Sequence, residues 1–287
     1  MEIILGKTAG FCYGVTRAIN GAEEELETNE NNVYCLGEIV HNKNVIDDLI
    51  KKGLKFIEDI KESKGKTIIR AHGVTKDVYQ KANEMNIELK DLTCPKVLKI
   101  HDIADKYTHL GYYVVLIGSE KHPEVIGIKS FCEDDKSCIV NDENDIEKTI
   151  LNIKKTEIKK VLIIAQTTYN SKKFDNIVNE IKEKIEDDYE VNIMKTICPA
   201  TEMRQRETEE IAKEVDYMII IGDKKSSNTN KLYEISSKYC KDTIFINNSN
   251  ELDTRSIKDK NKVGIMAGAS TPKENIELVF EKLIFNK

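Results

Sequence analysis

The chain has 287 residues, of which 40% are hydrophobic and 33% are charged. It is long enough to bury a substantial core, and this composition is ordinary for a globular protein. Its 44 lysines and arginines against 50 aspartates and glutamates leave a formal net charge of −6, which argues against nucleic acid or an anionic membrane surface as a partner.

The N-terminus gives no sign of export or membrane insertion. The chain opens with MEIILGKTAG, which runs straight into a strand pattern without the basic segment and cleavage site of a signal peptide. No apolar run approaches the roughly 20 residues needed to span a bilayer. Seven cysteines in such a chain are therefore expected to be reduced thiols, and the expected location is the cytoplasm.

Short apolar, β-branched runs predict strands that alternate with helices along the chain. This alternation is typical of βαβ units and of parallel sheets. Ligands of such sheets bind beyond the carboxyl ends of the strands, where loops lead into helices. The predicted strands include residues 67–69, 113–117, 161–164, 217–221 and 263–266, and the predicted helices include residues 172–184 and 202–215.

The chain repeats one pattern three times. Cys12, Cys94 and Cys198 each lie after a short apolar run and before a helix-like segment, in the contexts GFCYGV, DLTCPKV and TICPATE. A glycine that ends an apolar run follows 25, 24 and 24 residues later, at positions 37, 118 and 222. The segments TIIRAHGVT, VLIIAQTTYN and VGIMAGASTP then close the repeats. Such self-similarity predicts three related α/β modules around a pseudo-threefold axis.

One cysteine from each module makes a candidate ligand set. The three are too far apart in sequence for a zinc finger, which takes its ligands in close pairs. Pro95 and Pro199 occupy a first helical turn, where the missing N–H costs nothing. Because helix N-termini favour anions, the pattern favours an anionic metal–sulfur cluster with a negatively charged ligand beside it.

The loops after the predicted strands are rich in polar side chains. Near helix N-termini, His, Ser, Thr and Asn donors predict a phosphate or diphosphate cradle, whereas neither a Walker loop nor a strand-linked GxGxxG is present. Glu124 is the one carboxylate in the set, and beside Thr167 it is a candidate proton relay. The loop residues are His41, His72, His122, Glu124, Thr167, Thr168, Ser226, Ser227, Asn228 and Ser270.

The remaining cysteines and histidines favour structural roles. Cys35 and Cys240 lie in strand-like and helix-like runs, where a cysteine is usually a small buried hydrophobe. Cys132 and Cys138 flank an acidic loop; an inert pair is favoured there over a metal clip or a thiol switch. The other two histidines, His101 and His109, fall within and at the end of a predicted helix.

The ordered motifs resemble a known family along essentially the whole chain. They are GFCYGV, GEIVHN, RAHGV, DLTCP, GSEKHPEVIG, AQTT, TICPATEMRQ, GDKKSSNTNKL and AGASTP, and they are similar to those of the 4-hydroxy-3-methylbut-2-enyl diphosphate reductases, the LytB/IspH family. The resemblance implies a trefoil of three α/β modules around one [4Fe–4S] cluster, in an enzyme of isoprenoid biosynthesis. The expected modules cover residues 13–93, 94–193 and 194–287, the third completed by an N-terminal strand within residues 1–12.

The resemblance also implies a role for each motif residue. Cys12, Cys94 and Cys198 would hold the cluster, with its fourth iron open to substrate. Glu124 would donate a proton, working with Thr167. The diphosphate and the allylic alcohol would be bound by His41, His72, His122, Thr167, Ser226, Ser227, Asn228 and Ser270. The expected electron donor is reduced ferredoxin or flavodoxin.

Three alternatives stay open on the residues alone. A zinc hydrolase acting on a phosphorylated metabolite would keep the three cysteines, although catalytic zinc more often includes histidine. An iron–sulfur sensor would need a DNA-binding or partner-binding element, which the acidic balance disfavours. An aconitase-like dehydratase would need arginines for a polycarboxylate, whereas Arg70 is the only arginine in the strand-end motifs.

Overall fold

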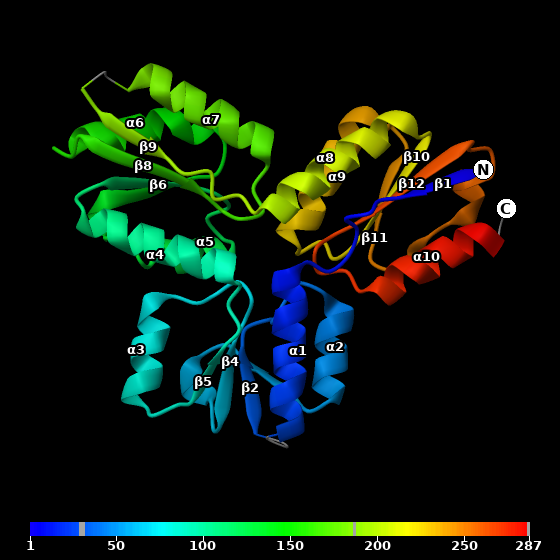
Figure 1. Cartoon of the computed structure of the whole chain (residues 1–287), viewed down its shortest axis with the longest axis horizontal. Helices are drawn as coiled ribbons and strands as arrows, with labels where there is room; N and C mark the ends of the chain where they lie inside the picture. The colour runs from blue at the N-terminus through cyan, green and yellow to red at the C-terminus, as the bar shows by residue number, and fades with distance from the viewer. Residues whose placement is uncertain (29–31, 186–187, 286–287) are drawn as a thin grey trace. The chain divides into compact units, whose positions relative to one another are not determined.

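The computed structural model describes residues 1–28, 32–185 and 188–285 of the chain. In this part of the chain, twelve strands form three sheets of four strands each, which we call sheets A, B and C (Figure 1). Sheet A has the order β1-β12-β10-β11, sheet B the order β3-β2-β4-β5, and sheet C the order β7-β6-β8-β9. Neighbouring strands are parallel throughout all three sheets.

The elements follow one another as strand and helix along most of the chain. The strands are β1 (Glu2–Leu5), β2 (Val33–Leu36), β3 (Lys55–Ile57), β4 (Lys66–Ile69), β5 (Leu89–Asp91), β6 (Tyr113–Ile117), β7 (Ser137–Val140), β8 (Lys160–Ala165), β9 (Glu190–Ile193), β10 (Tyr217–Ile221), β11 (Thr243–Ile246) and β12 (Lys262–Ala267). The α-helices are α1 (Tyr13–Thr28), α2 (Lys43–Lys51), α3 (Lys76–Glu84), α4 (Pro95–His109), α5 (Pro123–Lys129), α6 (Ile146–Lys155), α7 (Ser171–Lys184), α8 (Pro199–Glu214), α9 (Ser227–Tyr239) and α10 (Lys273–Phe285). Short 3-10 turns cover Ile60–Glu62, Asp134–Lys136, Glu143–Asp145, Ser249–Glu251 and Thr254–Ile257.

The chain divides into two compact units. One consists of Met1–Thr16, Val40–Lys51 and Pro199–Lys287, and it contains sheet A. The other consists of Arg17–Ile39 and Lys52–Cys198, and it contains sheets B and C. The N-terminal strand β1 pairs in parallel with β12, so the first unit brings the two ends of the sequence into one sheet.

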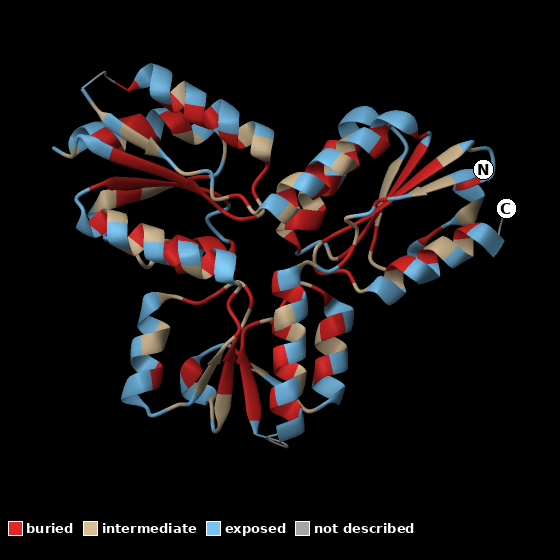
Figure 2. Cartoon of the chain, in the orientation of Figure 1, coloured by how far each residue is buried: buried red, intermediate tan, exposed pale blue. Residues whose placement is uncertain are grey.

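The central strands are buried on both faces (Figure 2). In sheet C, Val115 and Ile117 face a core with residues of α6 and α7, whereas Val114 and Leu116 face a core with residues of α4 and α5. Helices on both faces explain why β6 and β10 read as unbroken apolar runs rather than as an alternating pattern.

The expected α/β class with parallel sheets is confirmed. The predicted strands at residues 113–117 and 217–221 match β6 and β10, and the predicted helix at 202–215 begins three residues earlier, at Pro199. The three module boundaries and the threefold axis stay predictions. Among the described residues, no helix is both long and apolar enough to span a membrane.

Candidate functional site

The three repeated cysteines occupy equivalent places in the topology. Each follows an edge strand, β1, β5 or β9, and lies directly before the helix α1, α4 or α8. In each case the cysteine N–H donates to a carbonyl two residues past the end of the neighbouring strand. The bonds are Cys12 to Ala269 at 3.2 Å, Cys94 to Ala71 at 3.0 Å and Cys198 to Thr167 at 2.9 Å.

All seven cysteines lie in the described part of the chain as thiols. Cys12, Cys94 and Cys198 are partly exposed, whereas Cys35 and Cys240 are buried in the way that the sequence predicted for inert cysteines. Three accessible thiols at helix starts are soft donors of the kind that bind iron–sulfur clusters or zinc.

Cys132 and Cys138 are poor candidates for thiol chemistry. Burial raises the pKa of both thiols, so the reactive thiolate is disfavoured at neutral pH. The Cys132 Sγ contacts the carbonyl of Ile128, and the Cys138 Sγ contacts the hydroxyl of Thr149, each at 3.9 Å. The inert pair stays a prediction.

The glycines that end the central strands also form an equivalent set. Their N–H groups bond to the last carbonyls of β3, β7 and β11: Gly37 to Ile57 at 2.8 Å, Gly118 to Val140 at 2.9 Å and Gly222 to Ile246 at 2.9 Å. Four residues after each glycine the chain carries His41, His122 or Ser226. Each repeat therefore carries one polar side chain at the same position after its glycine.

Gly37 shows why this position needs glycine. Its φ is +70°, and a Cβ there would lie 2.0 Å from Nη1 of Arg70. The guanidinium of Arg70 thus packs directly on the loop that leads to His41, and no larger side chain fits without displacing it.

Glu124 is the buried acid of the site. It lies in the first turn of α5 and is only 2% exposed. Its Oε1 accepts from the N–H of Thr167 at 2.7 Å, and its Oε2 accepts from the Thr167 hydroxyl at 2.8 Å. Burial raises the pKa of Glu124 to about 7, against the two hydrogen bonds, which lower it. The carboxyl can therefore hold or release a proton near neutral pH.

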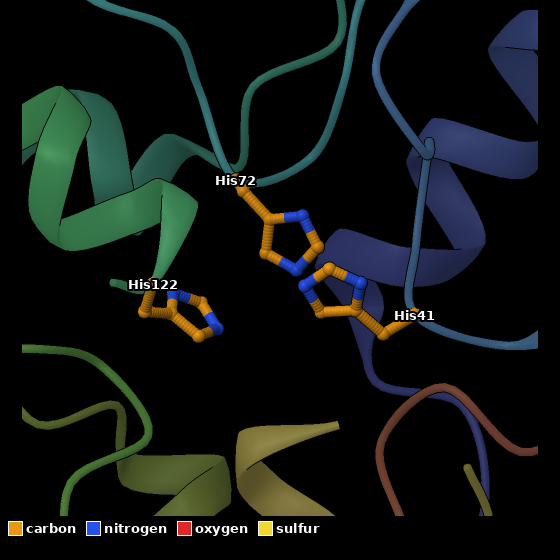
Figure 3. A group of neighbouring side chains, drawn as sticks. All are labelled: His41, His72 and His122. Atoms are coloured by element: carbon orange, nitrogen blue, oxygen red, sulfur yellow. The ribbon is translucent and has the colours of Figure 1, made fainter. Parts of the chain in front are cut away.

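His122 and His72 lie next to each other. Their ring centroids are 5.4 Å apart in an edge-on arrangement (Figure 3). His122 is the N-cap of α5, where its Nδ1 accepts from the N–H of Glu124 at 3.2 Å. Because Nδ1 is an acceptor, the neutral ring carries its proton on Nε2, which is then a donor toward an anion.

Gln166 joins the loops that carry these groups. Its Oε1 accepts from the N–H of Ser119 at 3.1 Å, and its Nε2 donates to the hydroxyl of Thr168 at 2.9 Å. The loop after β6 is thereby fixed to the loop after β8, which supports the contact between Glu124 and Thr167.

The other unit gathers the remaining polar residues of the prediction. Ser226 caps α9, its hydroxyl accepting from the N–H of Thr229 at 3.3 Å, and Ser227 begins the helix. The Ser270 hydroxyl donates to the carbonyl of His41 at 2.9 Å. Asn228 is 3% exposed, and neither polar atom of its side chain has a hydrogen-bond partner among the described residues. A buried amide of this kind is strongly stabilised when a polar ligand binds it.

The structure adds residues that sequence reasoning did not identify. Arg204 bonds to carbonyls of the segment that carries Cys12, and Arg17 bonds to carbonyls of the segment that carries Cys94. The only sequence signal for these arginines was that they follow Cys198 and Cys12 closely in the chain. Which carbonyls an arginine reaches depends on how its helix packs, and the sequence does not show that.

Comparison with known proteins gives one consistent result. The model of the family described as LytB protein matches residues 3–284. A 4-hydroxy-3-methylbut-2-enyl diphosphate reductase of Thermoanaerobacter sp. (strain X514) is 41% identical over 100% of this chain and 98% of its own length. The protein of that name from Clostridioides difficile (strain 630) is 40% identical over 97% of this chain and 98% of its own length.

Two solved structures agree in fold as well as in sequence. A structure of (E)-4-hydroxy-3-methyl-but-2-enyl diphosphate reductase, described as the terminal enzyme of the non-mevalonate pathway, has a TM-score of 0.70 and 37% identity, covering 99% of this chain and 100% of that one. The E-1-hydroxy-2-methyl-but-2-enyl-4-diphosphate reductase of Plasmodium falciparum has a TM-score of 0.90 and 30% identity, covering 98% and 87%.

Proposed function

We infer, because this chain belongs to the LytB protein family, that it reduces (E)-4-hydroxy-3-methylbut-2-enyl diphosphate to isopentenyl and dimethylallyl diphosphate. The reaction takes two electrons and two protons, breaks the C–O bond of the allylic alcohol and releases water. The observation that carries this inference is the full-length similarity to reductases of that name at about 40% identity. In the isoprenoid pathway this is the last step of the methylerythritol phosphate route.

We propose that Cys12, Cys94 and Cys198 hold one [4Fe–4S] cluster per chain and leave its fourth iron open. Their chemistry fits this group, because all three are partly exposed thiols at equivalent helix starts and cysteine thiolates are the usual ligands of such clusters. When bound, the cluster would pass on the two electrons from the donor one at a time and would offer a Lewis-acidic iron to the substrate hydroxyl.

The diphosphate and the alcohol are assigned to the polar loop residues. The two unpartnered polar atoms of Asn228 support this assignment, as does the Nε2 proton of His122, which follows from its N-cap bond. Helix N-termini at Pro123 and Ser227 favour the negative charge of the ligand. The proposed ligand set is His41, His72, His122, Thr167, Ser226, Ser227, Asn228 and Ser270.

Glu124 is assigned as the proton donor to the departing oxygen. With a pKa of about 7, a large share of its carboxyl groups is protonated at neutral pH. Thr167 contacts both carboxyl oxygens, so the carboxyl group is fixed in place and the Thr167 hydroxyl extends the relay. Burial of the pair keeps bulk water from competing for the proton.

The partners follow from the same proposal. Electrons arrive from a reduced ferredoxin or flavodoxin, and the enzyme works in the cytoplasm. Neither nucleic acid nor a membrane takes part.

Metal analysis of anaerobically purified protein tests the proposed function. We expect iron and acid-labile sulfide in equal amounts, approaching about four of each per chain, together with reduction of the allylic diphosphate. Cys94→Ser should lose most of the iron, whereas Cys132→Ser, at a cysteine outside the set, should keep it. Zinc without sulfide would instead point to the zinc hydrolase and overturn the proposal.

A further inference from the structure

Arg204 holds the backbone that leads to Cys12. This arginine lies on α8 and is 3% exposed. Its Nε donates to the carbonyl of Thr8 at 2.8 Å, and its Nη2 donates to the carbonyl of Gly10 at 2.9 Å. One rigid guanidinium therefore bridges two carbonyls just ahead of the cysteine.

Glu207 completes the contact from the next turn of α8. Its carboxylate accepts from the N–H of Lys7 at 2.6 Å and from the N–H of Thr8 at 2.8 Å. Burial raises the pKa of Glu207, but the hydrogen bonds from Thr8 and Lys7 outweigh it and hold the pKa below its usual value. Together the two side chains bind both the donors and the acceptors of the loop.

Arg17 makes the corresponding contact ahead of Cys94. It lies on α1, and its Nη1 donates to the carbonyl of Thr93 at 3.1 Å while its Nη2 reaches the carbonyl of Asp91 at 3.4 Å. Thr93 directly precedes Cys94 in the chain. As with Arg204, two donors of one guanidinium bond to two carbonyls that are two residues apart.

The segment ahead of Cys198 is held without an arginine. There the Thr196 hydroxyl donates to the carbonyl of Ala165 at 2.5 Å and accepts from the N–H of the same residue at 2.8 Å. Two of the three cysteine segments are thus held by a guanidinium and the third by a threonine. A mutation of one of these side chains therefore affects one cysteine segment at a time.

We propose that Arg204 and Arg17 are positioning residues that fix the Cys12 and Cys94 thiols, respectively, for cluster binding. The inference rests on the proposed function in so far as those thiols are cluster ligands. A guanidinium suits the task because its planar donors are preorganised in a fork, whereas the donors of an ammonium lie on one atom at the end of a flexible stem. Partners that orient metal ligands contribute about 10-fold to 100-fold to metal affinity when they are measured by mutation.

Alkylation of the cluster-free chain tests the positioning without any metal. We expect Arg204→Met to change the rate at which iodoacetamide modifies Cys12, read by peptide mass spectrometry, and to leave Cys94 unchanged. Arg17→Met should do the reverse. Arg206→Met is the matched control on α8, because Arg206 is exposed and pairs only weakly with Glu210 at 3.8 Å.

Cluster retention tests the consequence in the holoprotein. We expect the release of iron to a ferrous chelator to be about 10-fold faster or more in Arg204→Met and Arg17→Met, as in the corresponding lysine variants, and unchanged in Arg206→Met. The lysine variants keep the charge and guard against simple misfolding, which thermal unfolding of each variant checks.

The outcomes separate the two proposals. Wild-type alkylation patterns or wild-type iron release in both arginine variants would overturn the positioning role. Iron-free wild-type protein would overturn the cluster assignment, while the alkylation pattern would still report whether each arginine acts on its own cysteine.

Discussion

Glu124 holds its carboxyl group away from water, and Thr167 binds both of its oxygens. The two hydrogen bonds favour the charged form, yet burial outweighs them and places the pKa at about 7. One residue thus combines fixed geometry with a proton that is available at neutral pH. An exposed glutamate at the same point would be ionised and could not serve as the acid.

We expect turnover by the wild-type enzyme to fall as the pH rises through about 7, because the protonated form of Glu124 is the active one. Glu124→Gln should lower kcat by about 100-fold or more and abolish this limb of the profile. The amide can keep both contacts to Thr167, so iron content should stay at the wild-type level. Native turnover by the glutamine variant would remove Glu124 from its role.

The same carboxyl group affects stability. Its pKa is raised from 4.5 to about 7 on folding, so the folded chain holds the proton more tightly than the unfolded chain. This contribution to stability is present below pH 4.5 and is lost as the pH rises through about 7. Glu124→Gln should therefore flatten the pH dependence of the unfolding free energy in that window.

His101 shows what the sequence could not indicate about a single residue. It was expected to be structural, and it lies inside α4 at 2% exposure, stacked on Phe131 with ring centroids 4.3 Å apart. Neither of its ring nitrogens has a hydrogen-bond partner among the described residues. Burial lowers its pKa to about 4, so the ring is neutral at the pH of the cell. Only the packed structure reveals that its neighbours include two glycines, Gly73 in the loop after β4 and Gly127 inside α5.

At the scale of elements, the loop between β4 and α3 depends on that packing. Gly73 has a φ of +76°, and a Cβ on it would lie 2.9 Å from Cε1 of His101. The residue directly before it is His72, one of the proposed diphosphate ligands. A side chain at position 73 would therefore displace either this loop or α4.

We expect Gly73→Ala to lower the unfolding free energy by about 1–3 kcal/mol and to raise KM for the diphosphate. Gly111→Ala is the control, because Gly111 has a φ of +79° with open space around its Cβ position. Gly111→Ala places alanine at the same unfavourable positive φ but creates no contact with His101. Equal effects of the two substitutions on KM would show that the contact has no part in binding. Urea unfolding and steady-state kinetics measure both quantities.

Prediction from the sequence succeeded for the central strands and was weaker at the sheet edges. β6 and β10 are apolar at all five positions and were identified at their observed bounds. By contrast, β3 (KFI) and β5 (LKD) have three residues each with charged side chains among them, so no apolar run marks them. Edge strands need only one neighbour and can be short and polar. These two strands therefore could not be recognised from their own sequences, only from the sheet they join.

At the scale of the whole molecule, the threefold repetition of motifs predicted three α/β modules, and three four-stranded parallel sheets are present. The sequence singled out the candidate site residues because each falls in the loop after a strand or in the first turn of the helix that follows it, and their roles stay predictions. The arginines that hold the cysteine segments were not singled out, because they lie on helices whose partners are distant in sequence: Arg204 and Thr8 are 196 residues apart.

Removal of the proposed cluster should destabilise the folded chain. A ligand that binds only the native state adds to its stability by mass action. We expect chelation of iron under anaerobic conditions to lower the melting temperature of the wild type and to leave that of Cys94→Ser unchanged. The same melting temperature before and after loss of iron would contradict this expectation. Differential scanning fluorimetry gives the comparison.

The pairing of β1 with β12 sets an order of events during synthesis. Ile3 lies beside Val263 in sheet A, 260 residues later in the chain. The ribosome therefore releases β1 long before its partner strand exists, whereas the unit of residues 17–39 and 52–198 is complete about 70 residues before β12 ends. Cys12, whose N–H bonds to Ala269, reaches its final position only after nearly all of the polypeptide has been translated. Binding of the proposed cluster through Cys12 is therefore expected only after residue 269 has been synthesised.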